Sequence, residues 1–329
     1  MHRLFRSVQA VMDGLLEQQY LCNRTVATTL FLAAHLRKPL LVEGPAGVGK
    51  TSLAQALAGA LDTTLVRLQC YPGLDEAKAL YEWNYQKQLL YIQVAAGNNR
   101  HVWEELRQDI YTPEFLLARP LLKAFLSEKP VVLLVDEVDK SDEELESFLL
   151  EALSEFQVSI PELGTIRARH IPFTLLTSNS SREFSDALKR RCMHLYIPYP
   201  TVEQERAIVA LKVPGIDEVL ANQVVNFVHS LRRLALKKSP SISETLDFAR
   251  TMLLLETKRL EPRVVTQALN VLLKYQEDVE KVMAMLGDLM PEVQEEDSSP
   301  AAQSMIPDVS AADEKTGEPQ GVDLSRFNF

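Results

Sequence analysis

Residues 44–51 constrain the fold and chemistry of this chain more than any other stretch. They read GPAGVGKT and match the pattern G-x-x-x-x-G-K-T of a phosphate-binding loop. Glycines let the backbone approach a polyphosphate closely and adopt the unusual φ and ψ angles that such a loop requires. Lys50 would place its positive charge on the outer phosphates, and the Thr51 hydroxyl would bind Mg²⁺.

The sequence on both sides of the loop fits this interpretation. Residues 39–42 form a short apolar run typical of a buried strand, and residues 52–61 are rich in Ala and Leu, as in a helix. The N-terminus of that helix would point at the phosphates. The alternative is a glycine-rich turn with an incidental lysine. The expected nucleotide contacts are Gly44, Pro45, Ala46, Gly47, Val48, Gly49, Lys50, Thr51 and Ser52.

A pair of carboxylates follows a second apolar run. Residues 131–135 are all apolar, which is typical of a strand buried on both faces, and Asp136 and Glu137 come next. Ligands bind at the carboxyl ends of strands in open α/β sheets. Asp136 would hold Mg²⁺ directly or through water, and Glu137 would orient and activate an attacking water. The alternative is a strand followed by the acidic first turn of a helix.

Two further strand ends carry candidate residues. Asn179 follows the apolar run 173–177 and could bind the attacking water or the γ-phosphate, although asparagine is also common in turns. Arg190 and Arg191 precede a predicted strand at 194–197. A basic triplet is often only a solvated surface. In an assembled ring it could instead reach a neighbour's γ-phosphate, where an arginine supplied in trans raises the rate about 10³–10⁵-fold in GTPases.

The order of these features predicts an α/β fold: a P-loop core with a parallel sheet, then a small all-α lid domain and a disordered acidic tail. Pro198 and Pro200 mark the expected boundary. The predicted domains are residues 1–198, 199–289 and 290–329. Lid helices are expected at 202–212, 216–234, 243–259 and 263–287, the third opening with the capping-box pattern at 241–244.

Elsewhere in the predicted core the patterns are less regular. Residues 1–36 and 114–127 have helical spacing of apolar residues, and residues 157–169 fit a hairpin. The aromatic segment 80–91 has neither the apolar spacing of a helix nor the alternation of a strand, so we expect a short hairpin or a broken helix. The apolar end of the tail, 324–329, is interpreted as a frayed end or a docking peptide.

Bulk properties exclude some classes of protein. The net charge is −10, of which residues 291–329, with nine acids and two bases, contribute −7. The body, at −3, has no excess of basic residues, which argues against a large nucleic-acid surface. No run approaches the roughly 20 apolar residues of a membrane span, and the N-terminus has no cleavage signal. Three scattered cysteines form no metal pattern or disulfide framework, so we expect a cytoplasmic protein.

Taken in order, these motifs resemble those of the AAA+ ATPases. Longer strings resemble the MoxR family within them, and most closely the branch of carbon-monoxide-dehydrogenase accessory ATPases. The resemblance covers about residues 5–285. It rests on YPGLDEA at 71–77, LYEWNY at 80–85, PELG within 153–169, and PSISETLD at 240–247.

The resemblance implies ATP and Mg²⁺ as cofactors, a homo-hexameric ring with nucleotide between subunits, and chaperone-like remodelling of a client. It also implies a partner with a von Willebrand factor A domain and a client among the metal-cofactor enzymes. The segments at 80–92 and 157–169 match family insertions that face the pore or substrate side. A nucleic-acid motor or loader, or a nucleotide switch without significant turnover, are the alternative functions.

Family roles carry over only to matching positions. Lys50 and Thr51 match the phosphate and Mg²⁺ positions, Asp136 and Glu137 the second nucleotide motif, and Asn179 the first sensor. Arg191, directly before Cys192, is the favoured arginine finger, with Arg190 second. Many AAA+ lids have an arginine near the start of their third helix, where this chain has Pro-Ser-Ile-Ser at 240–243. Arg250 is the nearest candidate for that second sensor.

Overall fold

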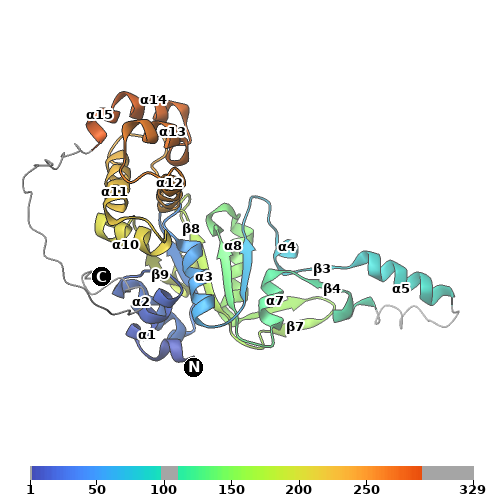
Figure 1. Ribbon diagram of the computed structural model, residues 1–329. Coiled ribbons are helices and arrows are strands. Elements are labelled where there is room, and N and C mark those ends of the chain that lie inside the picture. Colours follow the sequence, from blue (N-terminus) through green and yellow to red (C-terminus); the bar gives the residue numbers. More distant parts are fainter. Residues whose placement is uncertain (1, 98–109, 291–329) are drawn as a thin grey trace, which may run out of the picture.

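The computed structural model describes residues 2–97 and 110–290 (Figure 1). Its centre is a parallel five-stranded sheet in the order β2-β5-β8-β1-β9. The strands are β1 (Leu40–Glu43), β2 (Leu65–Gln69), β5 (Val132–Asp136), β8 (Phe173–Ser178) and β9 (Met193–Tyr196). The predicted α/β core with a parallel sheet is therefore confirmed.

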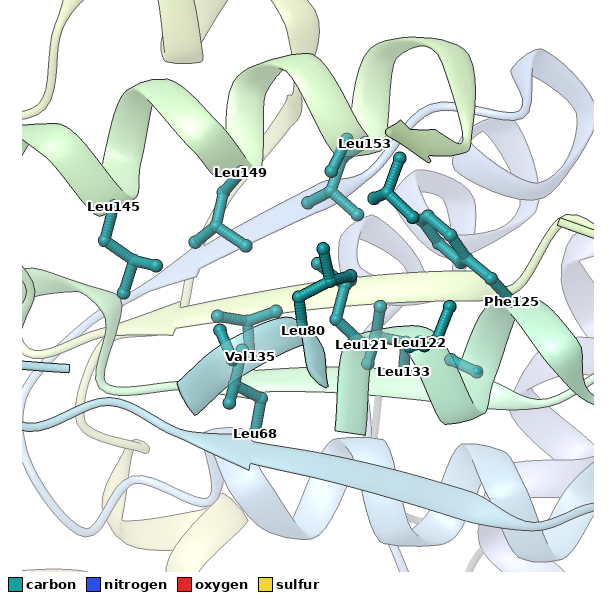
Figure 2. Packing of buried hydrophobic residues seen from close by; sticks show 14 of the residues in the cluster. Leu68, Leu80, Leu121, Leu122, Phe125, Leu133, Val135, Leu145, Leu149 and Leu153 are labelled. Carbon is teal, nitrogen blue, oxygen red and sulfur yellow. The ribbon is translucent and has the colours of Figure 1, made fainter. Parts of the chain in front are cut away.

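Both faces of the sheet are buried, which explains why its central strands are continuous apolar runs. On one face, Leu40, Val132 and Leu134 pack against helices near the N-terminus and after the loop. On the other, Leu133 and Val135 face leucines of α8 (Figure 2). The flanking helices are η1 (Arg3–Arg6), α1 (Val8–Glu17), α2 (Arg24–Leu36), α3 (Lys50–Ala60), α7 (Pro120–Leu126), η3 (Val138–Lys140), α8 (Glu143–Glu155) and α9 (Asp186–Arg191).

The aromatic segment after β2 forms an arm that projects from the core (Figure 1). It comprises α4 (Glu76–Leu80), β3 (Tyr81–Trp83), α5 (Tyr85–Gly97), η2 (Pro113–Phe115) and β4 (Leu116–Ala118). Strand β3 pairs antiparallel with β4, so its partner lies more than 30 residues away, with Trp83 opposite Leu116. The prediction of one helix over 114–127 is wrong, because residues 116–118 pair with β3 and a helix begins only at Pro120.

The predicted hairpin at 157–169 is present. It consists of β6 (Gln157–Ile160) and β7 (Gly164–Arg167), paired antiparallel. Gly164 has a φ of +76°, which a side chain would strain. In Figure 1, β7 lies on the same side of the core as the base of the arm.

A separate hydrophobic cluster holds the C-terminal helices together. These are α10 (Val202–Lys212), α11 (Glu218–Arg232), α12 (Ile242–Leu254), α13 (Pro262–Leu272), α14 (Gln276–Ala284) and α15 (Leu286–Leu289). Two predicted helices are wrong in extent. The third ends at Leu254, before Glu256 with its φ of +53°, and the fourth breaks at the extended backbone of Leu273 and Tyr275.

The capping box that opens α12 is present, with the backbone N–H of Ser241 donating to Glu244 Oε2 at 2.6 Å. No helix in the described ranges is long and apolar enough to cross a membrane. The predicted disordered tail, beyond Met290, and its apolar end at 324–329 lie outside the described residues.

Candidate active site

The loop at 44–51 joins β1 to α3 and curls over the N-terminus of that helix. Gly44, Gly47 and Gly49 have φ angles of +152°, +76° and +98°, and Gly49 is the N-cap residue of α3. A Cβ at Gly44 would lie 2.2 Å from the carbonyl oxygen of Ile197, directly after β9. The glycines are thus required both by backbone conformation and by close packing. A helix N-terminus in this arrangement offers backbone N–H groups to an anion.

Lys50 ties the loop to the end of β8. Its side chain is buried, and Nζ donates to the carbonyl oxygens of Gly44 and Pro45 at 2.7 Å each and to Asn179 Oδ1 at 2.9 Å. Burial lowers the pKa of Lys50, while the neighbouring carboxylates of Asp139, Asp136 and Glu137 act in the opposite direction. The ammonium group therefore lies at the mouth of the loop, next to the first-sensor candidate.

Asp136 is the most enclosed carboxylate of the site. Thr51 Oγ1 lies 3.2 Å from both of its oxygens, the Thr177 hydroxyl donates to Oδ1, and Arg67 Nη2 donates to Oδ2 at 2.5 Å. Close by, Asp139 is buried, and its Oδ1 has no hydrogen-bond partner among the described residues. Hydroxyl and carboxylate oxygens are the donors that Mg²⁺ prefers, so these residues fit a magnesium site.

Glu137 has an uncommon backbone conformation for a residue with a side chain, with φ of +56°. This turn directs its carboxylate toward Gln69 Nε2 at 2.8 Å and Lys140 Nζ at 2.6 Å. Its backbone N–H donates to Thr177 Oγ1 at 3.0 Å. Because the Thr177 hydroxyl also donates to Asp136, a single side chain fixes the relative position of the two carboxylates.

A cavity of about 290 Å³ adjoins the loop. Its walls come from residues 19–26, the phosphate loop, the end of β9, and the helices α10 and α12. Apolar side chains such as Leu211 and Leu246 line it together with the polar Asn23 and Gln204. Arg250 also lines it, with Nη1 donating to Asp247 Oδ1 at 3.0 Å. A mainly apolar pocket with a few polar groups suits the base and ribose of a nucleotide.

Helix α12 begins directly against the loop. A Cβ added at Gly47 would lie 2.4 Å from both Cβ and Oγ of Ser241, its N-cap residue. Ser241 is itself buried. The loop at Gly47 and the start of α12 are therefore packed so closely that no side chain fits between them.

Comparison with known families agrees with this geometry. Residues 40–199 match the family described as ATPase family associated with various cellular activities, or AAA. This part of the chain has the P-loop core of an AAA+ ATPase. Members of the family generally bind ATP with Mg²⁺ and commonly form oligomers. A search of curated proteins found no match.

Solved structures similar to this chain include the RuvB Holliday junction branch migration motor of Thermotoga maritima. It is 16% identical over 82% of this chain and 73% of that one, with a TM-score of 0.44. A point mutant of the same protein is 18% identical over 81% of this chain and 77% of that one, with a TM-score of 0.47. At these scores the likeness carries no functional inference.

Arg190 and Arg191 lie away from the other site residues of their own AAA domain. They end α9, immediately before β9, whereas the loop and the carboxylates follow the carboxyl ends of β1 and β5. The two groups are thus separated by the length of the sheet. Both arginines are exposed and line a second cavity of about 340 Å³ with Arg37 and Lys38. The structure brings Lys50, Thr51, Asp136, Glu137 and Asn179 together, but it does not bring these arginines to them.

Sequence reasoning missed three residues that contact the carboxylates: Arg67, Gln69 and Thr177. Residues 67 and 69 are two apart on β2, so they point to the same face of the strand. Gln69 lies beside Asp136 in the parallel register of β2 and β5. The available signal was the charged Arg67 inside the otherwise apolar run 65–68. The sequence alone does not show that β2 neighbours β5, so it does not reveal the contact with Asp136.

We expect Gly47→Ala to lower the melting temperature more than Gly73→Ala. Both glycines have a positive φ, +76° and +82°, so alanine incurs similar backbone strain, about 1–2 kcal/mol, at either position. Only at Gly47 does the new methyl group collide with Ser241, because nothing lies within 4 Å of a Cβ at Gly73. Thermal unfolding of the two variants measures the difference. Adding Ser241→Gly to Gly47→Ala should recover part of the lost melting temperature. Equal melting temperatures for Gly47→Ala and Gly73→Ala would contradict the contact between the loop and Ser241.

Proposed function

We propose that this chain is a Mg²⁺-dependent ATPase that converts ATP and water to ADP and phosphate. The observation that carries the proposal is the meeting of three groups at one edge of the sheet. The Lys50 ammonium is 2.9 Å from Asn179, the Thr51 hydroxyl is 3.2 Å from Asp136, and Glu137 adjoins Asp136. A protein that only bound nucleotide would have no need of Glu137 and Asn179.

Each residue has a role that its position supports. Lys50 and the loop N–H groups bind the phosphates, and Asn179 orients the terminal phosphate or the attacking water. Glu137 accepts the proton of that water. Thr51 and Asp136 would hold Mg²⁺, which neutralises charge on the phosphates. Arg250, in the wall of the cavity, is the candidate for the second sensor.

The proposed assembly is a homo-hexameric ring in which Arg191, or Arg190 beside it, reaches the nucleotide of the neighbouring subunit. Two observations support an action in trans. Both arginines are exposed, and they lie at the opposite edge of the sheet from the phosphate loop of their own subunit. The proposed units of each subunit are an AAA+ domain at 1–198, a lid at 199–289 and a tail at 290–329.

At a finer level we propose a cytoplasmic, MoxR-type chaperone ATPase. It would act with a von Willebrand factor A domain partner to remodel a metal-cofactor enzyme. This rests on the sequence strings described above. The arm, at 76–97 and 110–118, projects from the core as a substrate-facing element could, and the hairpin at 157–167 lies on the same side of the core as its base (Figure 1). Binding of DNA at low salt, where phosphate contacts are strongest, would instead support the alternative of a nucleic-acid motor.

Glu137→Gln should bind ATP normally but hydrolyse it about 10²–10⁴-fold more slowly, because the water loses its proton acceptor. Nucleotide binding and phosphate release by the same preparation measure the two properties. Glu143→Gln, an exposed change in the first turn of α8, is the matched control and should hydrolyse ATP normally. Wild-type turnover by Glu137→Gln would remove Glu137 from the mechanism and favour the nucleotide switch.

Arg191→Ala should retain ATP binding and a hexamer-sized mass with ATP, yet lose hydrolysis by about 10³-fold or more. Mixing gives a sharper test. In a ring containing Arg191→Ala and Glu137→Gln subunits, some interfaces combine an intact Glu137 with an intact Arg191 from the neighbour. The mixture should therefore be more active than either variant alone. A monomeric mass with ATP, together with normal hydrolysis by Arg191→Ala, would contradict the ring and the finger.

A further inference from the structure

Arg67 forms an ion pair with Asp136 that combines an accessible cation with an inaccessible anion. The side chain of Arg67 is 50% exposed, that of Asp136 only 3%, and the Nη2 and Oδ2 atoms are 2.5 Å apart. A buried carboxylate is costly unless charged or polar partners compensate it. Arg67 supplies the only positive charge that contacts Asp136 among the described residues. Its exposure leaves room for the guanidinium to turn outward without disturbing the core.

The contacts of Asp136 leave little capacity for another cation. Oδ1 accepts from the Thr177 hydroxyl, Oδ2 accepts from Arg67, and the Thr51 hydroxyl lies 3.2 Å from both. Mg²⁺ held by Thr51 and Asp136 requires one of these carboxylate oxygens, directly or through water. A guanidinium and a divalent cation on the same carboxylate compete for its oxygens and repel each other, although solvent at the half-exposed Arg67 weakens the repulsion.

We infer that Arg67 competes with the divalent cation for Asp136, and that Gln69 transmits this exchange to Glu137. The inference deepens the proposed ATPase function, on which it rests for the roles of the metal and the base. Arg67 pairs with Asp136 until a divalent cation binds the Asp136 carboxylate. The Arg67 side chain then turns toward solvent. It is a positioning residue, because it acts through Asp136 and Gln69.

The route to Glu137 consists of two hydrogen bonds. Arg67 Nη2 donates to Gln69 Oε1 as well as to Asp136, and Gln69 Nε2 donates to Glu137 Oε2 at 2.8 Å. Departure of Arg67 removes the group that anchors the oxygen of the Gln69 amide. The amide can then rotate away from Glu137, which retains Lys140 at 2.6 Å. Glu137 Oε2 thus loses one of its two donors when the metal is in place, which couples metal binding to activation of the base.

The direct test titrates Mn²⁺ into the nucleotide-free, full-length protein and measures free Mn²⁺ by electron paramagnetic resonance. Arg67→Met should bind Mn²⁺ about tenfold more tightly than the wild type, because the cation no longer displaces an ion pair. Arg119→Met is the matched control. Arg119 also makes a 2.5 Å ion pair with 45% exposure, but its partner is Glu82 on the arm, and Arg119 itself precedes α7. The affinity of the Arg119→Met variant for Mn²⁺ should equal that of the wild type. The Asp136→Asn variant should lose Mn²⁺ binding at this site.

Equal Mn²⁺ affinity in the wild type and Arg67→Met, or no binding by either, would overturn the inference. Arg67→Gln serves as a second neutral variant if Arg67→Met does not fold, as judged by circular dichroism. The result is independent of turnover. Tighter Mn²⁺ binding by Arg67→Met in a protein that hydrolyses no ATP would support the competition and refute the proposed function. Normal ATP hydrolysis together with an unchanged Mn²⁺ affinity in Arg67→Met would support the proposed function and refute the competition.

The link through Gln69 has its own readout, which is carbodiimide labelling of Glu137 located by mass spectrometry. Mg²⁺ should raise the labelling rate of Glu137 several-fold in the wild type. In Gln69→Leu the rate should already be high without Mg²⁺, since the amide no longer donates to Glu137 Oε2. The exposed Glu143 provides the reference rate in each sample. A Glu137 rate that does not respond to Mg²⁺ in the wild type would overturn the link.

Discussion

The pairing of buried charges at the carboxyl edge of the sheet is the constraint on which the rest of this site depends. Lys50 and Asp136 are both buried, and an ionised group in that position must find partners within reach. Strands β5, β8 and β1 are neighbours, so their carboxyl ends meet at one edge. At this edge Lys50 donates a hydrogen bond to Asn179, and Asp136 accepts from Thr51, Thr177 and Arg67. The strand order of the sheet thus determines which charges meet.

The C-terminal helices contact this edge through the start of α12. Among them, Glu205 is fully buried and accepts from Arg232 Nη2 at 2.8 Å and from His229 Nε2 at 2.8 Å. Arg232 also donates to the carbonyl oxygen of Pro240 at 2.8 Å, one residue before Ser241 touches the loop. Its guanidinium lies 5.0 Å from the ring centre of Tyr199, in the segment between β9 and α10. These contacts connect the start of α12, beside the loop, with α10 and α11.

Most of the core was predictable because its signals are local. A glycine pattern between a strand and a helix, and apolar runs followed by Asp136 or Asn179, depend only on neighbouring residues. The helix predicted over 114–127 was wrong because β4 exists only through its pairing with β3, more than 30 residues earlier. Arg67 and Gln69 were missed for the same reason. Their roles follow from the position of β2 beside β5, which is a property of the sheet and not of the strand.

The central claim is that Lys50 and the carboxylates form one hydrolytic site. Phosphate release from ATP by the full-length protein, measured beside Lys50→Ala with ATP binding followed in the same samples, tests it most directly. We expect the wild type to release phosphate only when Mg²⁺ is present, and Lys50→Ala to lose both binding and release. Release by Lys50→Ala at the wild-type rate, or a folded wild type that binds no ATP, would contradict the account.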